Sequence, residues 1–215
     1  MKTEIQYTRQ EEIFNSLTHG IGALLAVLGT IIIVKKADNN NVAMIMSVLI
    51  YGLTMIGMYS MSTLYHFAKP GKMKNVMQIF DHASIYLLIA GCYTPVTLIL
   101  LGGTGKALIM FAVVWIAAVA GIILNVVDMK KFKRVGMLLY LIMGWTAIVD
   151  IKNIIQLMGN KGATLMIAGG LSYTIGIIFY RMKQTKYMHC IWHLFVLAGS
   201  IFHYICILNY VVLVF

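Results

Sequence analysis

Two histidines four residues apart, His189 and His193, open the last apolar stretch of the sequence. Residues at this spacing lie one above the other on one face of an α-helix, so both imidazoles can reach the same ligand. A basic run at 181–186 precedes them, and the chain after them is largely apolar to Phe215. Because an unpaired imidazole is costly in hydrocarbon, the two rings need partners from other helices at the same depth.

The composition predicts an integral membrane protein. The 215 residues are 60% hydrophobic and 11% charged, whereas a soluble domain is roughly half apolar and a quarter charged. The net charge of +10 does not indicate nucleic-acid binding, because the basic residues form short clusters between apolar segments. Such clusters are typical of loops at an anionic cytoplasmic leaflet. The three cysteines all lie in apolar segments and offer no disulfide framework.

Seven stretches are long enough to cross about 30 Å of hydrocarbon at about 1.5 Å per residue. They are 17–34, 42–67, 77–101, 106–127, 135–157, 163–180 and 189–213. We therefore expect an all-α membrane protein, a seven-transmembrane helix bundle. Residues 1–16 are expected to form a cytoplasmic N-terminal segment, and residues 17–215 a single transmembrane domain.

The basic residues predict the orientation of this bundle. With the N-terminus inside, the cytoplasmic segments hold twelve of the 17 basic residues: Lys2, Arg9, Lys69, Lys72, Lys74, Lys130, Lys131, Lys133, Arg134, Arg181, Lys183 and Lys186. The opposite side holds the other five: Lys35, Lys36, Lys106, Lys152 and Lys161. The positive-inside rule then puts the N-terminus in the cytoplasm and, after seven crossings, the C-terminus outside.

This topology brings polar residues from four helix ends to about one depth in the cytoplasmic leaflet. They are His19 at the start of the first span, Ser62 and His66 at the end of the second, Asp81 and His82 near the start of the third, and His189 and His193 at the start of the seventh. Scattered polar residues would not share one depth, so we infer a shared site.

The residue types at this depth suit a metal. His66 is the best candidate for a third ligand, and Ser62 lies one turn below it on the same face. Three neutral imidazoles with one open position are typical of a catalytic zinc ion. Asp81 can hold a water at the metal or act as a general base. The alternative is that each histidine only forms a hydrogen bond with a neighbouring helix.

The remaining polar residues allow more than one interpretation. His203 lies about 15 Å farther along the helix than the histidine pair, too far to share the metal, so we expect it to bond to a neighbouring helix. His82 can support the site or simply pack. His19 shares a helical face with Glu12 and Ser16, and this face can form a polar cap on the site.

Several short motifs run from one end of the chain to the other. They are EIFNSLTHG at 12–20, STLYH at 62–66, FDHASI at 80–85, AGCYTP at 90–95 and HCIWH at 189–193, followed by His203-Tyr204. With these motifs the sequence resembles the haemolysin III family of bacterial membrane proteins, which are relatives of the progestin and adiponectin receptors. That family is similar to the alkaline ceramidases in having a serine, an aspartate and three histidines on seven helices.

The resemblance implies a Zn²⁺ site on His66, His189 and His193, with Asp81 holding the zinc water and Ser62 nearby. It also implies the topology with the N-terminus inside and the C-terminus outside. Kinship of fold does not select the function. The expected location is the cell membrane of a bacterium, where the protein is a multi-pass integral component.

Three functions are compatible with these expectations. The first is a zinc-dependent hydrolase, a ceramidase-like enzyme that cleaves an amide bond in a lipid-like substrate. The second is a non-catalytic regulator or receptor-like sensor of the membrane or energy state, in which zinc is structural. The third is a haemolysin-type pore-former, for which no amphipathic insertion segment is evident. The expected partner is a membrane lipid or lipid-like small molecule and not nucleic acid; the sequence does not indicate an oligomeric state.

Overall fold

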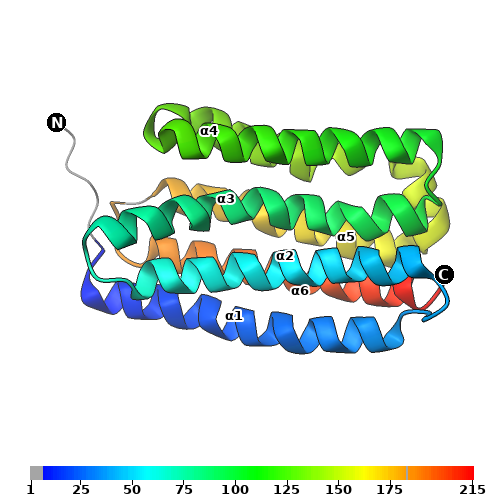
Figure 1. Cartoon of the computed structure of the whole chain (residues 1–215), viewed down its shortest axis with the longest axis horizontal. Coiled ribbons are helices and arrows are strands. Elements are labelled where there is room, and N and C mark those ends of the chain that lie inside the picture. Colours follow the sequence, from blue (N-terminus) through cyan, green and yellow to red (C-terminus); the bar gives the residue numbers. More distant parts are fainter. Residues whose placement is uncertain (1–6, 183) are drawn as a thin grey trace.

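The computed structural model describes residues 7–182 and 184–215, and the regular elements in these ranges are helices. The long ones are α1 (Arg9–Lys36), α2 (Val42–Phe67), α3 (Lys72–Pro95), α4 (Gly105–Gly144), α5 (Ile151–Arg181) and α6 (Met188–Ile207). Short elements are η1 (Val96–Leu100), η2 (Thr146–Asp150) and η3 (Leu208–Val212). The helices run along the long axis of the molecule (Figure 1). The predicted all-α class is therefore confirmed.

Helix α1 begins at Arg9, well before the predicted span at 17, because Thr8 caps it. The Thr8 hydroxyl accepts a hydrogen bond from the Glu11 backbone N–H at 3.3 Å, and Glu11 Oε2 accepts one from the Thr8 backbone N–H at 2.9 Å. This reciprocal capping box satisfies two N–H groups at the helix start. The extra turns place Glu12 and Asn15 on the helix. Residues 1–6 of the predicted N-terminal segment lie outside the described residues, as do Lys2 and Lys183 of the charge count.

The helix type changes at Pro95. Proline has no N–H to donate to the preceding turn, so regular α-helical bonding cannot continue through it. Helix α3 ends at Pro95 and the chain continues as the π-helical turn η1. The Thr94 hydroxyl donates to the Ala90 carbonyl at 2.9 Å.

Among the described residues, five helical segments are long and apolar enough to cross a membrane, and one of these, 105–181, contains 77 residues. Non-helical backbone interrupts it at Asp128 (φ −161°, ψ 89°) and at Gly159 (φ 68°). Asp128 Oδ1 accepts a hydrogen bond from the Lys131 N–H at 2.9 Å, an N-cap contact that starts a new helix. The chain reverses its direction at this break, so that α4 consists of two helical halves lying side by side (Figure 1).

A tyrosine of α3 contacts both halves of α4. The Tyr86 ring, 1% exposed, lies against Gly121 of the first half, and its hydroxyl lies over Gly136 of the second half. A β-carbon at either glycine would collide with this side chain, so the two halves approach α3 closely only because both positions lack one. Because the helix is broken at Asp128, both halves of α4 can pack against Tyr86 of α3.

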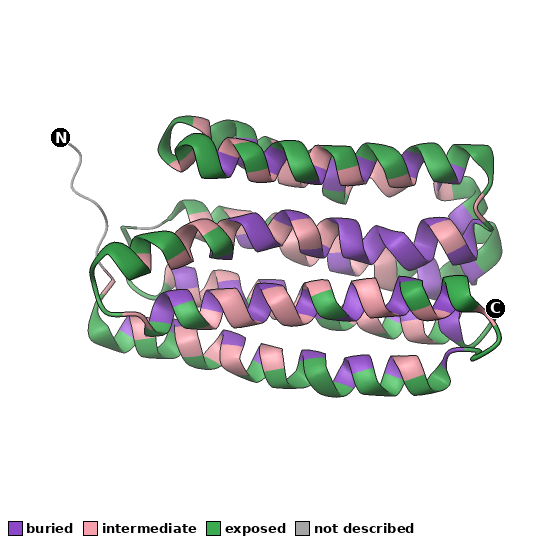
Figure 2. Cartoon of the chain, in the orientation of Figure 1, coloured by how far each residue is buried: buried purple, intermediate pink, exposed green. Residues whose placement is uncertain are grey.

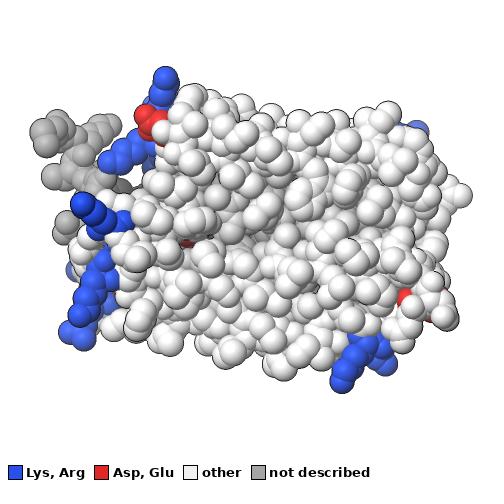
Figure 3. All heavy atoms as spheres, viewed as in Figure 1, with Lys and Arg blue, Asp and Glu red and all other residues white. Residues whose placement is uncertain are grey.

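The distribution of polarity is the reverse of that in a soluble protein. Large apolar side chains such as Leu24 and Ile116 are more than 65% exposed, whereas Asn15, Ser62 and His193 are almost fully buried. Figure 2 shows exposed residues along the outer faces of the helices, and Figure 3 shows Lys and Arg gathered near the ends of the bundle. A surface of this kind suits lipid, because apolar side chains face outward and polar side chains face the interior of the bundle.

Candidate metal centre

Three histidines from two helices meet where α2 ends and α6 begins. His189 Nε2 lies 3.2 Å from His66 Nε2 and 3.1 Å from His193 Nε2. One ligand nitrogen from each ring lies within 4.8 Å of the other two. His66 is 2% exposed, His189 7% and His193 1%. The structure therefore brings together the three predicted ligands, which we call the histidine triad.

In His66 and His193 the Nδ1 atom, which points away from the other triad rings, has a partner that determines which ring nitrogen carries the hydrogen. His66 Nδ1 lies 2.6 Å from Glu12 Oε2, and His193 Nδ1 lies 3.2 Å from the Asn15 carbonyl oxygen. A carboxylate and a carbonyl accept but cannot donate, so these partners assign the hydrogen of each neutral ring to Nδ1. Nε2 of both rings then presents a lone pair toward His189.

The spacing of the triad fits a metal ion. Nitrogens bound at about 2.0–2.1 Å in a tetrahedral zinc site are about 3.3 Å apart, close to the 3.1 and 3.2 Å found here. Acceptors on the outer nitrogens are also the usual means of orienting metal-bound imidazoles. No cysteine or carboxylate from the described part of the chain completes the group. The residues can therefore hold a metal with three imidazole ligands.

Helix α1 provides the acceptors, although it provides no ligand. Glu12 and Asn15 lie three residues apart on one face, and the Thr18 hydroxyl, three residues further, lies 3.2 Å from His193 Nδ1. Glu12 Oε1 lies 2.9 Å from Lys74 Nζ at the start of α3, so one carboxylate joins a ligand to a lysine. The triad is thus held by α1 and α3 as well as by its own helices.

Aromatic rings cover two of the ligands. Tyr7 stacks on His189 with ring centres 5.0 Å apart. His19 stacks on His193 at 3.6 Å and 12°, and its other contact is the edge of Tyr59 at 5.0 Å. His19 therefore supports a ligand by packing. Of the polar face predicted for α1, Glu12 and His19 contact triad residues, whereas the Ser16 hydroxyl donates to the Thr63 carbonyl at 3.3 Å.

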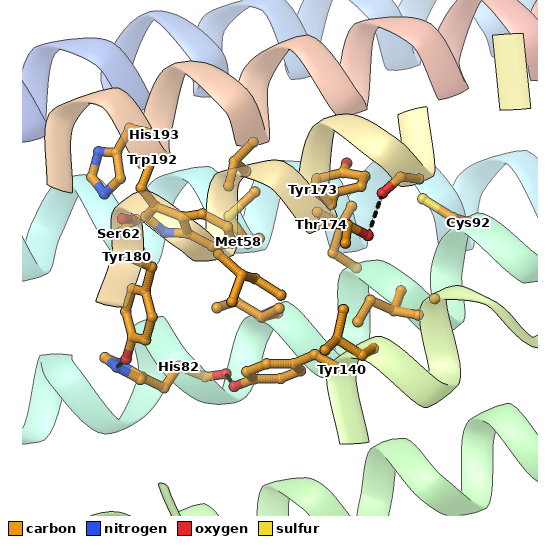
Figure 4. A pocket seen from close by; sticks show the side chains of 18 of the residues that line it. Met58, Ser62, His82, Cys92, Tyr140, Tyr173, Thr174, Tyr180, Trp192 and His193 are labelled. Carbon is orange, nitrogen blue, oxygen red and sulfur yellow. Dashed lines mark hydrogen bonds between the residues drawn. The ribbon is translucent and has the colours of Figure 1, made fainter. Parts of the chain in front are cut away.

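Asp81 and Ser62 line a cavity of about 110 Å³ that also contains His189 and His193 in its wall. Asp81 is 8% exposed and Ser62 is 1% exposed. Figure 4 shows Ser62 and His193 near one end of this cavity and Cys92 near the other. Asp81 and Ser62 thus face the same cavity as His189 and His193 but do not belong to the triad.

The two remaining histidines have partners of their own. His82 Nδ1 lies 3.4 Å from Asp81 Oδ2 and 2.9 Å from the Gln78 carbonyl, while His82 Nε2 lies 3.3 Å from the Tyr180 hydroxyl (Figure 4). His203 Nε2 lies 3.2 Å from the Met166 carbonyl on α5, and His203 is outside the triad. His203 therefore bonds to a neighbouring helix as predicted, and His82 contacts Asp81 rather than a ligand.

Comparison with known proteins agrees with these motifs. The model of the family described as "Haemolysin-III related" matches residues 7–204, which is most of the chain. The chain belongs to the haemolysin III family. The resemblance inferred from the motifs is therefore confirmed, and the protein is a haemolysin III family membrane protein.

Relatives of this haemolysin III protein cover nearly its whole length. "Hemolysin-3" of Bacillus cereus is 40% identical over 203 residues, covering 94% of this chain and 92% of the relative. "Hemolysin-3 homolog" of Bacillus subtilis (strain 168) is 39% identical over 207 residues, covering 96% and 97%. "Monocyte to macrophage differentiation factor" of Homo sapiens is 28% identical over 211 residues, covering 94% and 85%.

Several contacts of this haemolysin III protein had no signal in the sequence. The Asn15 acceptor is a backbone carbonyl, which any residue type would provide. Lys74 was assigned only to the charge bias of a loop, and Tyr7 lies before the first helix. The start of α1, in contrast, had a readable signal in the Thr8–Glu11 spacing of its capping box.

Metal content tests the triad directly. The purified protein, supplied with zinc, is expected to bind about one ion per chain, because one triad has room for one tetrahedral ion. His66→Ala and His193→Ala should lose it, whereas His203→Ala is a matched control that should retain it. Elemental analysis by mass spectrometry measures the ratio, and unchanged metal in both triad variants would contradict the assignment.

Metal affinity tests the role of Glu12. Glu12→Ala removes the acceptor on His66 Nδ1 and should weaken metal binding about 10- to 100-fold, as measured by competition with a chelator. Glu11→Ala is the control, because it removes the neighbouring carboxylate and the capping box without a contact to a triad residue. Equal affinity loss in the two variants would mean that Glu12 acts only through the stability of α1.

Proposed function

We propose that this protein is a zinc-dependent membrane hydrolase that cleaves an amide bond in a lipid-like substrate. The observation that carries the proposal is the buried triad, whose lone pairs converge beside a cavity containing the carboxylate of Asp81. A purely structural histidine cluster has no need of an adjoining cavity with a carboxylate in its wall.

In this proposal His66, His189 and His193 hold the zinc ion. When bound, zinc acts as a Lewis acid and makes water more acidic at neutral pH. Asp81 accepts the proton from the attacking water and returns it to the amine nitrogen as the C–N bond breaks, and its contact with His82 keeps it in place. The Ser62 hydroxyl can donate a hydrogen bond to the substrate carbonyl oxygen, since it lines the same cavity.

The shape and lining of the interior support a substrate with a long apolar part. The wall next to the triad includes Met58, Leu88 and Val196. A second cavity of about 180 Å³ shares Trp145 and other wall residues with the first and extends to Ile148, which is 62% exposed on the outer surface. An acyl chain would fit this path from the triad toward lipid. The choice of an amide rests on the resemblance to the alkaline ceramidases.

The proposal includes seven crossings, with the N-terminus in the cytoplasm and residues 17–215 forming one domain. A continuous helix of 77 residues would be about 115 Å long, almost four times the hydrocarbon thickness. In this proposal the breaks at Asp128 and Gly159 divide the segment into three passes, and the 3₁₀ turn η2 lies within the second of them. The 12-to-5 bias of basic residues gives the orientation and places the triad near the cytoplasmic face.

A second candidate function is a membrane sensor in which zinc is structural. It is favoured by the position of the triad, because His66 comes from α2 and His193 from α6, so one ion would bind both helices. A metal there would fix the two helices relative to each other. Pore formation is less favoured, because no amphipathic insertion segment is evident in the sequence; the name of the Bacillus cereus relative says only that that protein is a haemolysin.

Reporter fusions test the topology. A reporter placed after Phe215 is expected to be active only outside the cytoplasm, because seven crossings separate it from a cytoplasmic N-terminus. Fusions truncated after Gly103 should report outside, and those truncated after Lys131 should report inside. A full-length fusion that is active only in the cytoplasm would overturn both the orientation and the cytoplasmic placement of the triad.

The Asp81→Asn variant separates catalyst from ligand. It should retain about one zinc ion per chain, since three imidazoles remain, and it should lose hydrolysis of lipid amides roughly 10²–10⁴-fold, because an amide cannot accept the proton. Metal content and release of fatty acid from a lipid extract are both measured by mass spectrometry.

His193→Ala is the comparison for that experiment, because it should lose metal and hydrolysis together. If Asp81→Asn loses its zinc as completely, Asp81 is a metal ligand and not the proton acceptor. If it keeps both the zinc and the full biological activity, the hydrolase proposal fails and the structural-zinc sensor takes its place.

A further inference from the structure

A third, more polar cavity lies beside His189, near the ends of α2, α3 and α6. We call it the vestibule; its volume is about 520 Å³. Its wall includes Lys74 from α3, Lys130 and Lys133 from α4, and hydroxyl and amide groups such as those of Tyr65 and Asn75. His189 of the triad lines it as well. The vestibule therefore connects a group of cations to the proposed reaction centre.

The charge balance of the vestibule is positive. The one carboxylate in its wall, that of Glu12, pairs with Lys74 and His66, so Lys130 and Lys133 give the wall its excess of positive charge. Lys74 lies over the Tyr65 ring at 4.7 Å and Lys133 lies near the Tyr180 ring at 5.9 Å, so both ammonium groups are held beside the cavity by aromatic rings. A cavity with this balance attracts an anion.

The vestibule and the apolar cavity share part of their walls. Both are lined by His82, Tyr180, His189 and Trp192. The 3.3 Å contact between His82 Nε2 and the Tyr180 hydroxyl lies at this shared wall (Figure 4). A molecule with a charged end in the vestibule and an apolar chain in the cavity would have its middle next to His189.

We propose that the vestibule binds a phosphate group, and that Lys130 and Lys133 recognise the phosphorylated headgroup of an amphiphile. Ammonium groups bind phosphate oxygens through charge-assisted hydrogen bonds, and several cations around one cavity suit a doubly charged phosphate monoester. The inference rests on the proposed function, because it names the class of headgroup carried by a substrate of that same centre. A free phosphate ion has the same chemistry, and the experiment distinguishes the two sources.

Calorimetric titration of the full-length protein in neutral detergent tests the inference with three probes. They are inorganic phosphate, dihexanoyl phosphatidic acid and dihexanoyl phosphatidylcholine. Phosphatidic acid is expected to bind tightest and to weaken as salt is added. Lys130→Gln combined with Lys133→Gln should raise its Kd roughly 10-fold or more, because two charge-assisted contacts are lost.

The matched control is Lys131→Gln combined with Arg134→Gln. It removes the same charge from the same segment, but neither residue lines the vestibule. Its Kd should remain within about twofold of the wild-type value, because exposed charges outside the cavity contribute little. All four side chains belong to exposed residues, so both double variants are expected to fold.

The outcomes are distinct. Binding of phosphatidic acid alone, sensitive to the vestibule lysines, identifies a lipid headgroup, and equally sensitive binding of inorganic phosphate identifies a general phosphate site. The inference is overturned if no phosphate probe binds, if both double variants weaken binding equally, or if phosphatidylcholine binds as tightly as phosphatidic acid. None of the probes contains an amide, so a failure of hydrolysis leaves this test unaffected. Conversely, hydrolysis of a neutral amide lipid without phosphate binding contradicts this inference alone.

Discussion

The contact of three imidazole nitrogens inside an apolar bundle is the constraint on which the rest of the structure depends. A buried nitrogen lone pair without a partner is costly, and two such lone pairs here point toward a third ring. His66 and His193 cannot turn away, because Glu12 and the Asn15 carbonyl hold their outer nitrogens. A cation at the centre would satisfy the inner nitrogens, which explains why an otherwise apolar chain concentrates imidazoles at one place.

The same constraint accounts for how the helices around the triad are arranged. Helix α1 packs against both α2 and α6, the two helices that carry the ligands, and its polar residues face that junction. The capping box at Thr8 starts α1 before Glu12, so that the residues orienting the rings lie on regular helix. The conformation at one end of α1 thus determines the orientation of rings on two other helices.

The sequence contained enough information to predict which three histidines cluster, and less to predict what orients them. Imidazoles and a carboxylate stand out in apolar spans, so His66, His189, His193 and Asp81 could be placed by depth alone, and the predicted span at 42–67 coincides with α2. The fifth predicted span, 135–157, is not one helix, because the chain leaves α-helical geometry between Gly144 and Ile151. Backbone acceptors and ring stacking depend on tertiary contacts that no local pattern encodes.

The order of the ligands along the chain has a consequence for synthesis. The orienting groups of α1 emerge from the ribosome first, His66 follows on α2, and the two remaining ligands arrive only with α6, the last long helix. Because N-terminal segments fold and insert first, the early helices must wait in the membrane with an incomplete site. An ion held by all three imidazoles would therefore be captured only by a chain that has been translated and inserted as far as His193, and its presence would mark completed biogenesis.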